Sequence, residues 1–266
     1  MAVIWALVFF AVLSVGITRV VASQAGLLQR VEGWVLGEAA MRSACGHARR
    51  EIQNKKEPYW SQADLMRERA VEFGIARVRY HFVDQESRIN INAAPQDVLA
   101  RLPGLGPDLA TKILASPLRP FPVTEALLWV EDLDEKAFAA CRDHITVHSN
   151  TRVNINTASP VVLQALGLEA VLATAIDTAR RGPDGDPGTD DDGIFEDTGS
   201  IETVLAPVLR MTQAQKERLD SLFNAGMLGV SSENFTLKAV VDVLGKRVMD
   251  YDIVLSAYKV MRWQEY

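Results

Sequence analysis

The stretch RININAAPQDVLARLPGLG, residues 88–106, is followed 64 residues later by a second version of itself, RVNINTASPVVLQALGLE, residues 152–169. The two versions share an Asn-Ile-Asn core, and Ala, Val, Leu and Leu recur after it at spacings of four, one and three. This pattern predicts an extended segment that leads into a helix with one apolar face. The chain therefore contains two copies of one supersecondary unit, which we expect to lie side by side.

The polar residues common to both copies are asparagines: Asn90, Asn92, Asn154 and Asn156. Asn side chains readily bond nearby backbone groups, as Asx turns and helix caps. We interpret these four as structural groups at the starts of helices rather than as catalytic groups. The sequence also has no nucleophile elbow, no phosphate-binding Gly-rich loop and no His-Glu-x-x-His motif. Nothing in it supports an enzyme or a small-molecule substrate.

The first copy continues into a helix-hairpin-helix pattern. A Pro-Gly-x-Gly turn at residues 103–106 separates one helix from a second that starts at Pro107, whereas the second copy reaches only Leu166-Gly-Leu168. Such hairpins bind DNA when turn amides hold a phosphate and basic side chains lie nearby. Only three basic residues qualify here: Arg101, Lys112 and Arg119. We therefore expect structural or protein-contacting hairpins and no nucleic-acid partner.

The overall charge points the same way. The 266 residues carry a net charge of −6, and 23% of them are charged and 48% hydrophobic. This composition is that of a globular protein, and the chain is long enough for one large or two modest domains. An acidic chain has no field that attracts nucleic acid or an anionic membrane.

An apolar segment opens the chain and leads into a longer helical pattern. Residues 2–18 carry no charge, and with the next few residues the run reaches about 20, enough to cross the ~30 Å hydrocarbon layer. Neither a basic region before it nor a small-residue cleavage site after it marks a signal peptide. Apolar positions recur through residues 27–40, and the first Pro is Pro58, which predicts one helix over residues 1–56. Four glycines are expected to weaken and flex it: Gly16, Gly26, Gly33 and Gly37.

Predicted strands flank the repeated region. Residues 75–83 alternate apolar and polar side chains, and residues 235–243 and 251–263 are two Val/Tyr/Phe-rich runs that predict an antiparallel hairpin. A short helical pattern covers residues 61–72. The fold class is therefore α+β, with a large helical insertion inside a small sheet domain.

The predicted domain boundaries follow from these elements. Residues 57–89 and 233–266 form the sheet body, and residues 90–232 form the α-helical insertion with both Asn-Ile-Asn repeats. Within the insertion, residues 182–202 form an acidic loop.

The acidic loop has two interpretations. A run of like charges is usually a flexible solvated loop. However, carboxylates at alternate positions around Gly and Pro turns also form the hard-oxygen sites that bind Ca²⁺. We expect a structural Ca²⁺ site, because so many carboxylates would repel one another without a cation. Its candidate ligands are Asp184, Asp186, Asp190, Asp191, Asp192, Glu196 and Asp197.

Cys45 and Cys141 are the two cysteines of the chain. Two cysteines are too few for a disulfide-stabilised fold or for a metal site formed by a cysteine cluster. The two form a disulfide if the body is exported, or are small buried apolar residues if it is cytosolic. Both alternatives remain open from the sequence.

Together these features resemble the K-type minor pseudopilins of bacterial type II secretion, also called general secretion pathway protein K. The likeness covers nearly the whole chain: an apolar N-terminal helix, an Arg-Ile-Asn-Ile-Asn phrase, a helical insert with a second copy, and a strand-rich C-terminus. The paired Asn-Ile-Asn phrases are its most specific part. Residues 120–149 are also similar to that family's stretch between the repeats.

The resemblance implies a pilin-like fold, a long N-terminal helix plus a small antiparallel sheet, with a large α-helical insertion that often binds Ca²⁺. It implies a pseudopilus tip complex with I-type and J-type minor pseudopilins, which supports export of folded proteins across the outer membrane. Most pseudopilins carry Glu at the fifth position of the mature chain and the K type lacks it; here that position is Trp5, and the first acidic residue is Glu32. An alternative is a membrane-anchored DNA receptor of the competence type. The net negative charge of this chain argues against that alternative.

Orientation depends on the leader. The first basic residues, Arg19 and Arg30, follow the apolar run and would place the body in the cytoplasm by the positive-inside rule. The family's short basic leader and its Gly cleavage site do not stand before Met1. We expect either a misassigned start or a mature chain, and a lost leader restores a single-pass inner-membrane anchor with a periplasmic body.

Overall fold

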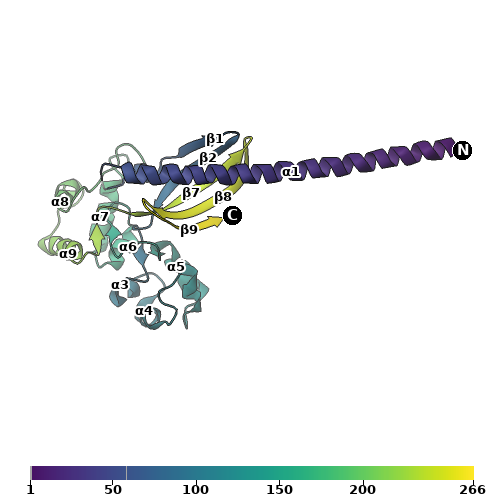
Figure 1. Cartoon of the computed structure of the whole chain (residues 1–266). Coiled ribbons are helices and arrows are strands. Elements are labelled where there is room, and N and C mark those ends of the chain that lie inside the picture. The colour runs from purple at the N-terminus through teal and green to yellow at the C-terminus, as the bar shows by residue number, and fades with distance from the viewer. Residues whose placement is uncertain (1, 58) are drawn as a thin grey trace.

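One long helix dominates the shape of the molecule (Figure 1). The computed structural model describes residues 2–57 and 59–266, and it begins with α1, Ala2–Asn54, which has 53 residues. The most apolar 18-residue window of α1 has a mean hydropathy of 2.2, and none of that window is buried. By length and composition, α1 can cross a membrane.

The C-terminal half of α1 packs on the sheet through a narrow stripe. Its buried residues recur every three or four positions: Ala40, Met41, Ala44, Cys45 and Ala48. Small side chains allow a helix to approach a sheet closely. At Gly37, an added Cβ would lie 3.2 Å from Val241 Cγ1 and closer still to Met249 Cε. Gly37 therefore serves close packing, a role that the sequence analysis did not assign to it.

A five-stranded antiparallel sheet forms the rest of the body. Its order is β1-β2-β7-β8-β9. The strands are β1 (Arg69–Phe73), β2 (Ala76–Asp84), β7 (Asn234–Val243), β8 (Lys246–Ser256) and β9 (Val260–Glu265). Along β2 the buried residues alternate with partly exposed ones, so one face packs under α1 and the other, outer face is polar.

Two local predictions on the body were wrong. The helix predicted over residues 61–72 ends early, since α2 spans Gln62–Met66 and β1 follows it. Arg69 of β1 is held by Glu51 of α1, with Nη2 to Oε1 at 2.6 Å, and β1 pairs with β2 along its whole length. This long-range pairing overrides the local helical pattern.

The C-terminal run also divides differently from the prediction. Residues 251–263 belong to two strands, because the chain turns after Ser256, where the Ser256 N–H donates to the Lys259 carbonyl at 2.8 Å. β8 begins at Lys246, earlier than the predicted start of the run at residue 251. The hairpin bend is confined to Leu244 and Gly245, both of which have positive φ.

The insertion between β2 and β7 consists of short helices and two-residue strands. Its helices are α3 (Gln96–Ala100), α4 (Gly106–Ala115), η1 (Thr124–Trp129), α5 (Glu135–Cys141), η2 (Arg142–His144), α6 (Pro160–Ala165), α7 (Ala170–Arg180), α8 (Ser200–Leu205) and α9 (Gln213–Asn224). Its strands form two parallel pairs, β3 (Ile89–Asn90) with β4 (Ile145–Thr146) and β5 (Val153–Asn154) with β6 (Leu228–Gly229).

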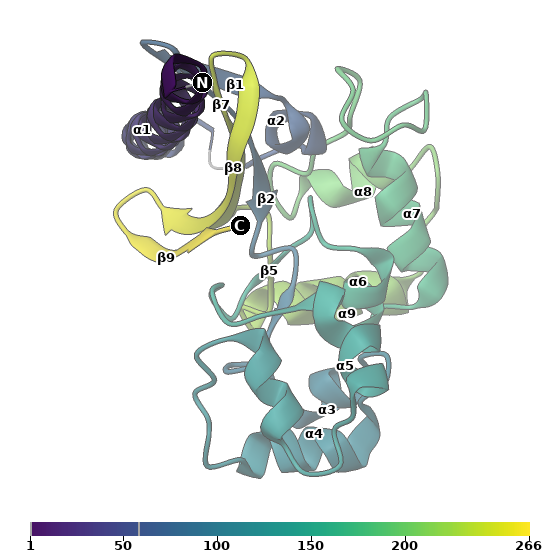
Figure 2. The same cartoon turned by 90° about the vertical axis from the view of Figure 1, so that its right-hand side faces the viewer.

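Two separate hydrophobic cores divide the chain. One holds α1 against the sheet, with members between Ala40 and Phe82 and between Phe235 and Leu255. The other lies wholly in the insertion, with members from Ile89 to Leu228. Viewed along α1, the insertion lies beside the sheet, away from the helix (Figure 2). The fold is thus the expected long helix and antiparallel sheet with a helical insertion.

Candidate functional site

The two Asn-Ile-Asn phrases adopt the same local structure. In each, the first Asn side chain accepts a hydrogen bond from the N–H two residues on: Asn90 Oδ1 from Asn92, and Asn154 Oδ1 from Asn156, both at 2.9 Å. These are Asx turns, and each turns the chain from a two-residue strand toward the next helix. The short strand before each turn is paired in parallel with the strand that ends the same copy.

The second Asn of each phrase clasps a buried Phe in a later loop. The Asn92 side chain accepts from Phe121 N at 2.7 Å and donates to Phe121 O at 2.9 Å. Asn156 does the same to Phe195, at 2.8 and 2.9 Å, and also donates to Val230 O at 3.0 Å. Each repeat therefore extends beyond the residues that are identical in the two copies, because the loop after each helix pair also belongs to it.

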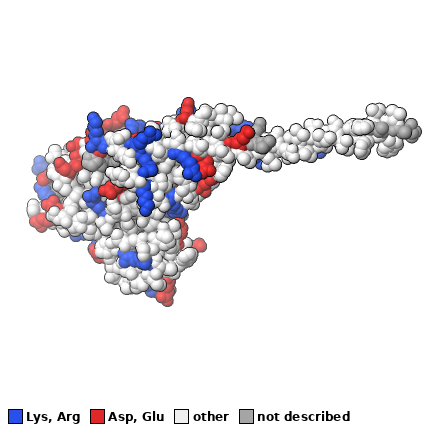
Figure 3. All heavy atoms as spheres, in the orientation of Figure 1, with Lys and Arg blue, Asp and Glu red and all other residues white. Residues whose placement is uncertain are grey.

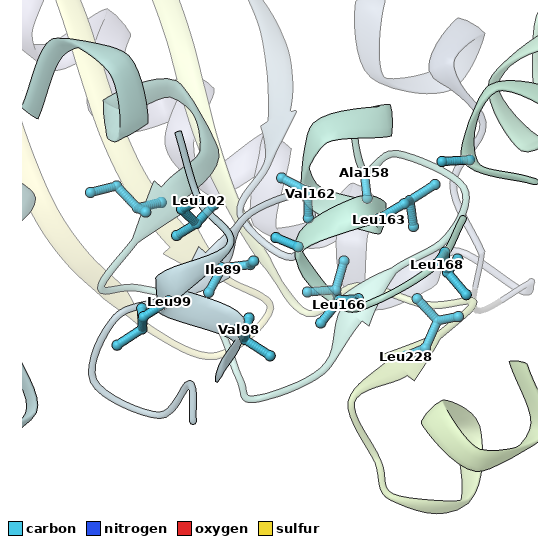
Figure 4. Close-up of a cluster of buried hydrophobic side chains, with 14 of the residues drawn as sticks. Ile89, Val98, Leu99, Leu102, Ala158, Val162, Leu163, Leu166, Leu168 and Leu228 are labelled. Carbon is cyan, nitrogen blue, oxygen red and sulfur yellow. The ribbon is translucent and has the colours of Figure 1, made fainter. Parts of the chain in front are cut away.

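The helices of both copies bury their apolar faces in one shared core (Figure 4). The equivalent positions of the two copies all lie in it: Val98, Leu99 and Leu102 from the first, and Val162, Leu163 and Leu166 from the second. Arg101 of the first copy also donates to the Ala165 carbonyl of the second, at 3.0 Å. The copies thus lie side by side and form one body.

Both hairpin turns make a close contact with another part of the chain. An added Cβ at Gly104, where φ is +80°, would lie 2.8 Å from the Ala137 carbonyl oxygen of α5. At Gly167, where φ is +90°, it would meet the guanidinium of Arg218. Each turn thus packs closely against another part of the insertion at one glycine, whereas an added Cβ at Gly106 of the first turn would meet nothing within 4 Å. The close contacts favour a structural role for the hairpins.

Two buried carboxylates join the sheet body to the second repeat. Asp84, the last residue of β2, and Glu86 are 2% and 1% exposed. Asp84 Oδ2 accepts hydrogen bonds from three side chains of the insertion: Asn154 Nδ2 at 3.1 Å, Thr157 Oγ1 at 2.5 Å and Ser232 Oγ at 2.6 Å. We call the pair of Asp84 and Glu86 the carboxylate joint.

Glu86 binds the segment that returns the chain to the sheet. Its Oε1 accepts from Asn234 Nδ2 at 2.6 Å and from Asn150 N at 3.3 Å, and its Oε2 accepts from Asn234 N at 3.1 Å. Burial, followed by the charge of Asp84, raises the pKa of Glu86 to about 7. Burial also raises the pKa of Asp84, against the hydrogen bonds that it accepts. The joint could not be predicted from the sequence pattern, because the alternation that predicts the strand ends at Val83.

The candidate Ca²⁺ ligands are distributed along their loop rather than gathered at one point. Among residues 2–57 and 59–266, no group of three or more His, Cys, Asp or Glu side chains is arranged to hold a metal ion. Asp191 Oδ2 accepts from Asp184 N at 3.3 Å, which places these two ligands close together. Asp186 and Asp190 lie in the same loop and are exposed.

The remaining candidate ligands have other contacts. Asp197 Oδ1 accepts from Ser200 N at 2.7 Å, at the start of α8, and Glu196 Oε1 accepts from the Tyr59 hydroxyl at 3.3 Å. Asp192 Oδ2 accepts from Ala63 N at 3.0 Å and so ties the loop to α2. Its other oxygen, Oδ1, is buried and has no hydrogen-bond partner among the described residues. A cation in this loop would satisfy that buried oxygen.

The two cysteines lie in different cores. Cys45, on α1, belongs to the core of the body, and Cys141, at the end of α5, belongs to the core of the insertion. Both thiols are free and buried. The disulfide alternative therefore does not describe this structure, and both residues act as small apolar groups.

Comparison with known proteins supports the fold. A family model described as a helix-hairpin-helix motif matches residues 84–146. The structure is similar to a chain of the GspK–GspI–GspJ complex from the type 2 secretion system of enterotoxigenic Escherichia coli, with a TM-score of 0.59 and 16% identity. The match covers 92% of this chain and 99% of that chain. No curated protein sequence matches this chain.

This likeness extends over α1, the sheet and the insertion together, since it covers nearly all of both chains. It confirms the K-type resemblance at the level of the fold. The helix-hairpin-helix match spans the first repeat from Asp84 to Thr146, which is the segment between the end of β2 and the end of β4.

Proposed function

We propose that this chain is a minor pseudopilin of a type II secretion system, a non-enzymatic subunit that supports export of folded proteins across the outer membrane. The observation that carries this proposal is the fold match over 92% of the chain to a structure of the GspK–GspI–GspJ complex. By that likeness, its partners are I-type and J-type minor pseudopilins, with which it forms the tip of the pseudopilus.

The shape of α1 supports an anchored assembly subunit. Its first half projects from the body with almost no charge on the face in view (Figure 3). Apolar side chains remain exposed beyond the part needed to span a bilayer, including Val31, Trp34 and Val35, which are between 47% and 59% exposed. Such a stalk offers apolar surface to neighbouring helices. In this proposal α1 anchors the chain in the inner membrane and the body lies in the periplasm.

Co-purification tests the proposed role. The full chain in a neutral detergent is expected to form a complex with I-type and J-type pseudopilins when the three are produced together. Tagged I-type subunit should retain this chain through size-exclusion chromatography. Recovery of this chain alone, with neither partner, would remove the proposal, and a gel shift of duplex DNA at physiological salt would favour the DNA receptor instead.

We also propose that the acidic loop at residues 182–202 binds structural Ca²⁺. The donor set is chemically suitable, because carboxylates and backbone carbonyls are the oxygen ligands that Ca²⁺ prefers. The unsatisfied Oδ1 of Asp192 and the neighbouring Asp184 and Asp191 would be the first ligands. When bound, the ion would reduce the repulsion between the carboxylates of the loop and fasten the loop to α2 through Asp192, whose Oδ2 accepts from Ala63 N.

Chelation provides the test for Ca²⁺. With a Kd of about 10 to 100 µM, Ca²⁺ at about 1 mM should stabilise the fold by about 1.4 to 2.7 kcal/mol over EGTA, measured by thermal melting. The double variant Asp190→Ala/Asp192→Ala should lose this shift, whereas Asp220→Ala, which removes an exposed acid of α9, should keep it. Identical melting of the unmodified chain in Ca²⁺ and in EGTA would show that the loop binds no ion.

A further inference from the structure

A cleft lies between the outer face of the sheet and the first repeat. One wall comes from β7, β8 and β9, and the other from η1, η2 and β4, with a volume of about 230 Å³. This space is the size of a few side chains, so it suits an extended segment or a loop rather than a folded domain. We call it the basic cleft.

The charge of the cleft is opposite to that of the chain. Four cationic side chains line it against two carboxylates; the cations are Arg88, Arg142, Lys238 and Arg262, and the acids are Glu125 and Asp252. Lys238 and Asp252 form an ion pair, with Nζ 3.0 Å from Oδ2, and Arg142 Nε lies 3.8 Å from Asp143 Oδ1 in a longer, exposed pair. A protein with a net charge of −6 thus presents a local cationic surface here.

The arginine shared by the two repeats behaves differently in each copy. In the second copy, Arg152 donates to Ser231 Oγ at 3.2 Å and packs over Gly229. The equivalent Arg88 is half-buried in the wall of the cleft, and among the described residues its guanidinium forms no ion pair and no side-chain hydrogen bond. Burial lowers the pKa of Arg88, and the charges of Asp143 and Asp84 oppose this effect only in part.

A second unsatisfied group lies in the same wall. His148 Nε2 is buried and has no hydrogen-bond partner among the residues that the structure describes. Burial, followed by the charge of Arg262, lowers the pKa of His148, so its ring is neutral and one nitrogen is available to donate. An arginine and an imidazole that both lack partners are the groups that a carboxylate would satisfy.

We infer that the basic cleft binds an acidic segment of a protein partner, with Arg88 and Arg142 as the main recognition residues. This inference rests on the proposed role as an assembly subunit and adds the chemistry of one contact. A membrane lipid is the less suitable anion, because the cleft lies on the body while the apolar half of α1 projects away from it (Figure 1).

Fluorescence anisotropy with a labelled hexaglutamate peptide tests the inference on the full chain in neutral detergent at low salt. The peptide should bind, and labelled hexalysine should not. The double variant Arg88→Gln/Arg142→Gln should weaken hexaglutamate binding about 10-fold or more, since each substitution removes a charged hydrogen-bond donor to the carboxylates. Arg142→Gln alone changes an exposed residue, keeps the fold, and should weaken binding about 3-fold.

A matched control removes two exposed arginines outside the cleft. Arg50→Gln/Arg77→Gln should leave the affinity for hexaglutamate within about 2-fold. An equal loss in this control, or no binding by the unmodified chain, would overturn the inference. So would charge-dependent binding to anionic phospholipid vesicles in place of the peptide. If I-type and J-type subunits still co-purify in any of these cases, the proposed function stands and only the cleft is wrong.

Discussion

Replacing Glu86 by Gln is expected to remove the loss of stability that Glu86 causes as the pH rises from about 5 to about 8. Glu86 is 1% exposed, and its pKa of about 7 in the folded chain exceeds its ordinary value of 4.5. A raised carboxyl pKa means that the folded state holds a proton which the unfolded state releases. Its contribution to stability is therefore complete below about pH 4.5 and is lost as the pH rises through 7.

The expected size follows from the shift. A difference of this size in the pKa of one group corresponds to on the order of 3 kcal/mol in the free energy of unfolding across this range. The Gln variant carries no titrating proton at position 86, so it should lack the part of the fall in melting temperature with rising pH that Glu86 causes in the unmodified chain. Thermal melting at pH 5, 6, 7 and 8, followed by circular dichroism, measures the two slopes.

Other groups titrate in the same range with the opposite sign. Burial lowers the pKa of His81, His144 and His148, so their contributions to stability are lost as the pH falls rather than as it rises. The comparison with Glu86→Gln isolates the joint, because both proteins keep all three histidines. The titrating neighbour of Glu86 is Asp84, whose own pKa is raised by burial. Parallel pH profiles for the two proteins would show that Glu86 stays ionised in the fold.

The large elements of the fold could be predicted from the sequence because they depend on local patterns. A long apolar run without Pro predicts α1, alternation predicts β2, and a Val/Tyr/Phe-rich run predicts β7. The errors came where distant residues decide the outcome. β1 became a strand because β2 offers it a partner and Glu51 holds Arg69, and neither fact is visible in residues 61–72 themselves.

The site could be predicted only in part, for a related reason. The repeated asparagines were visible, and their short-range Asx turns follow from residue type. Their longer bonds to Phe121 and Phe195, which lie 29 and 39 residues away, depend on how the loops return. A signal existed nonetheless, since a Phe follows the helix pair in each copy. The carboxylate joint had a weaker signal in the sequence: the two acids of Asp-Gln-Glu, residues 84–86, directly follow the predicted strand at residues 75–83.

The arrangement of these contacts suggests why the repeats persist in the fold. Each copy begins and ends in a parallel strand pair, so its two ends are fixed together. The joint then attaches the second copy to β2 through Asp84 and to the start of β7 through Glu86. The insertion is thereby held to the sheet at both points where the chain crosses between them. A rigid connection of this kind allows force or partner contacts on the insertion to reach the sheet and α1.

The clasp in the second copy is expected to be the more sensitive of the two. Asn156 is 2% exposed and its side chain bonds Phe195 N, Phe195 O and Val230 O. Asn156→Ala leaves these backbone groups buried without partners, and each such group costs about 1–3 kcal/mol. We expect a loss of about 3–5 kcal/mol in the free energy of unfolding, measured by urea unfolding in neutral detergent.

Asn92→Ala removes the equivalent clasp from the first copy. Asn92 is only partly buried and bonds Phe121 alone, so water can replace its contacts, and we expect a smaller loss of about 1–2 kcal/mol. Asn224→Ala, at an exposed position on α9, is the matched control and should change stability by less than about 0.5 kcal/mol. Equal losses for Asn92 and Asn156 would mean that the extra bond to Val230 and the deeper burial do not matter. Losses no larger than that of the control would mean that the clasps do not stabilise the repeats.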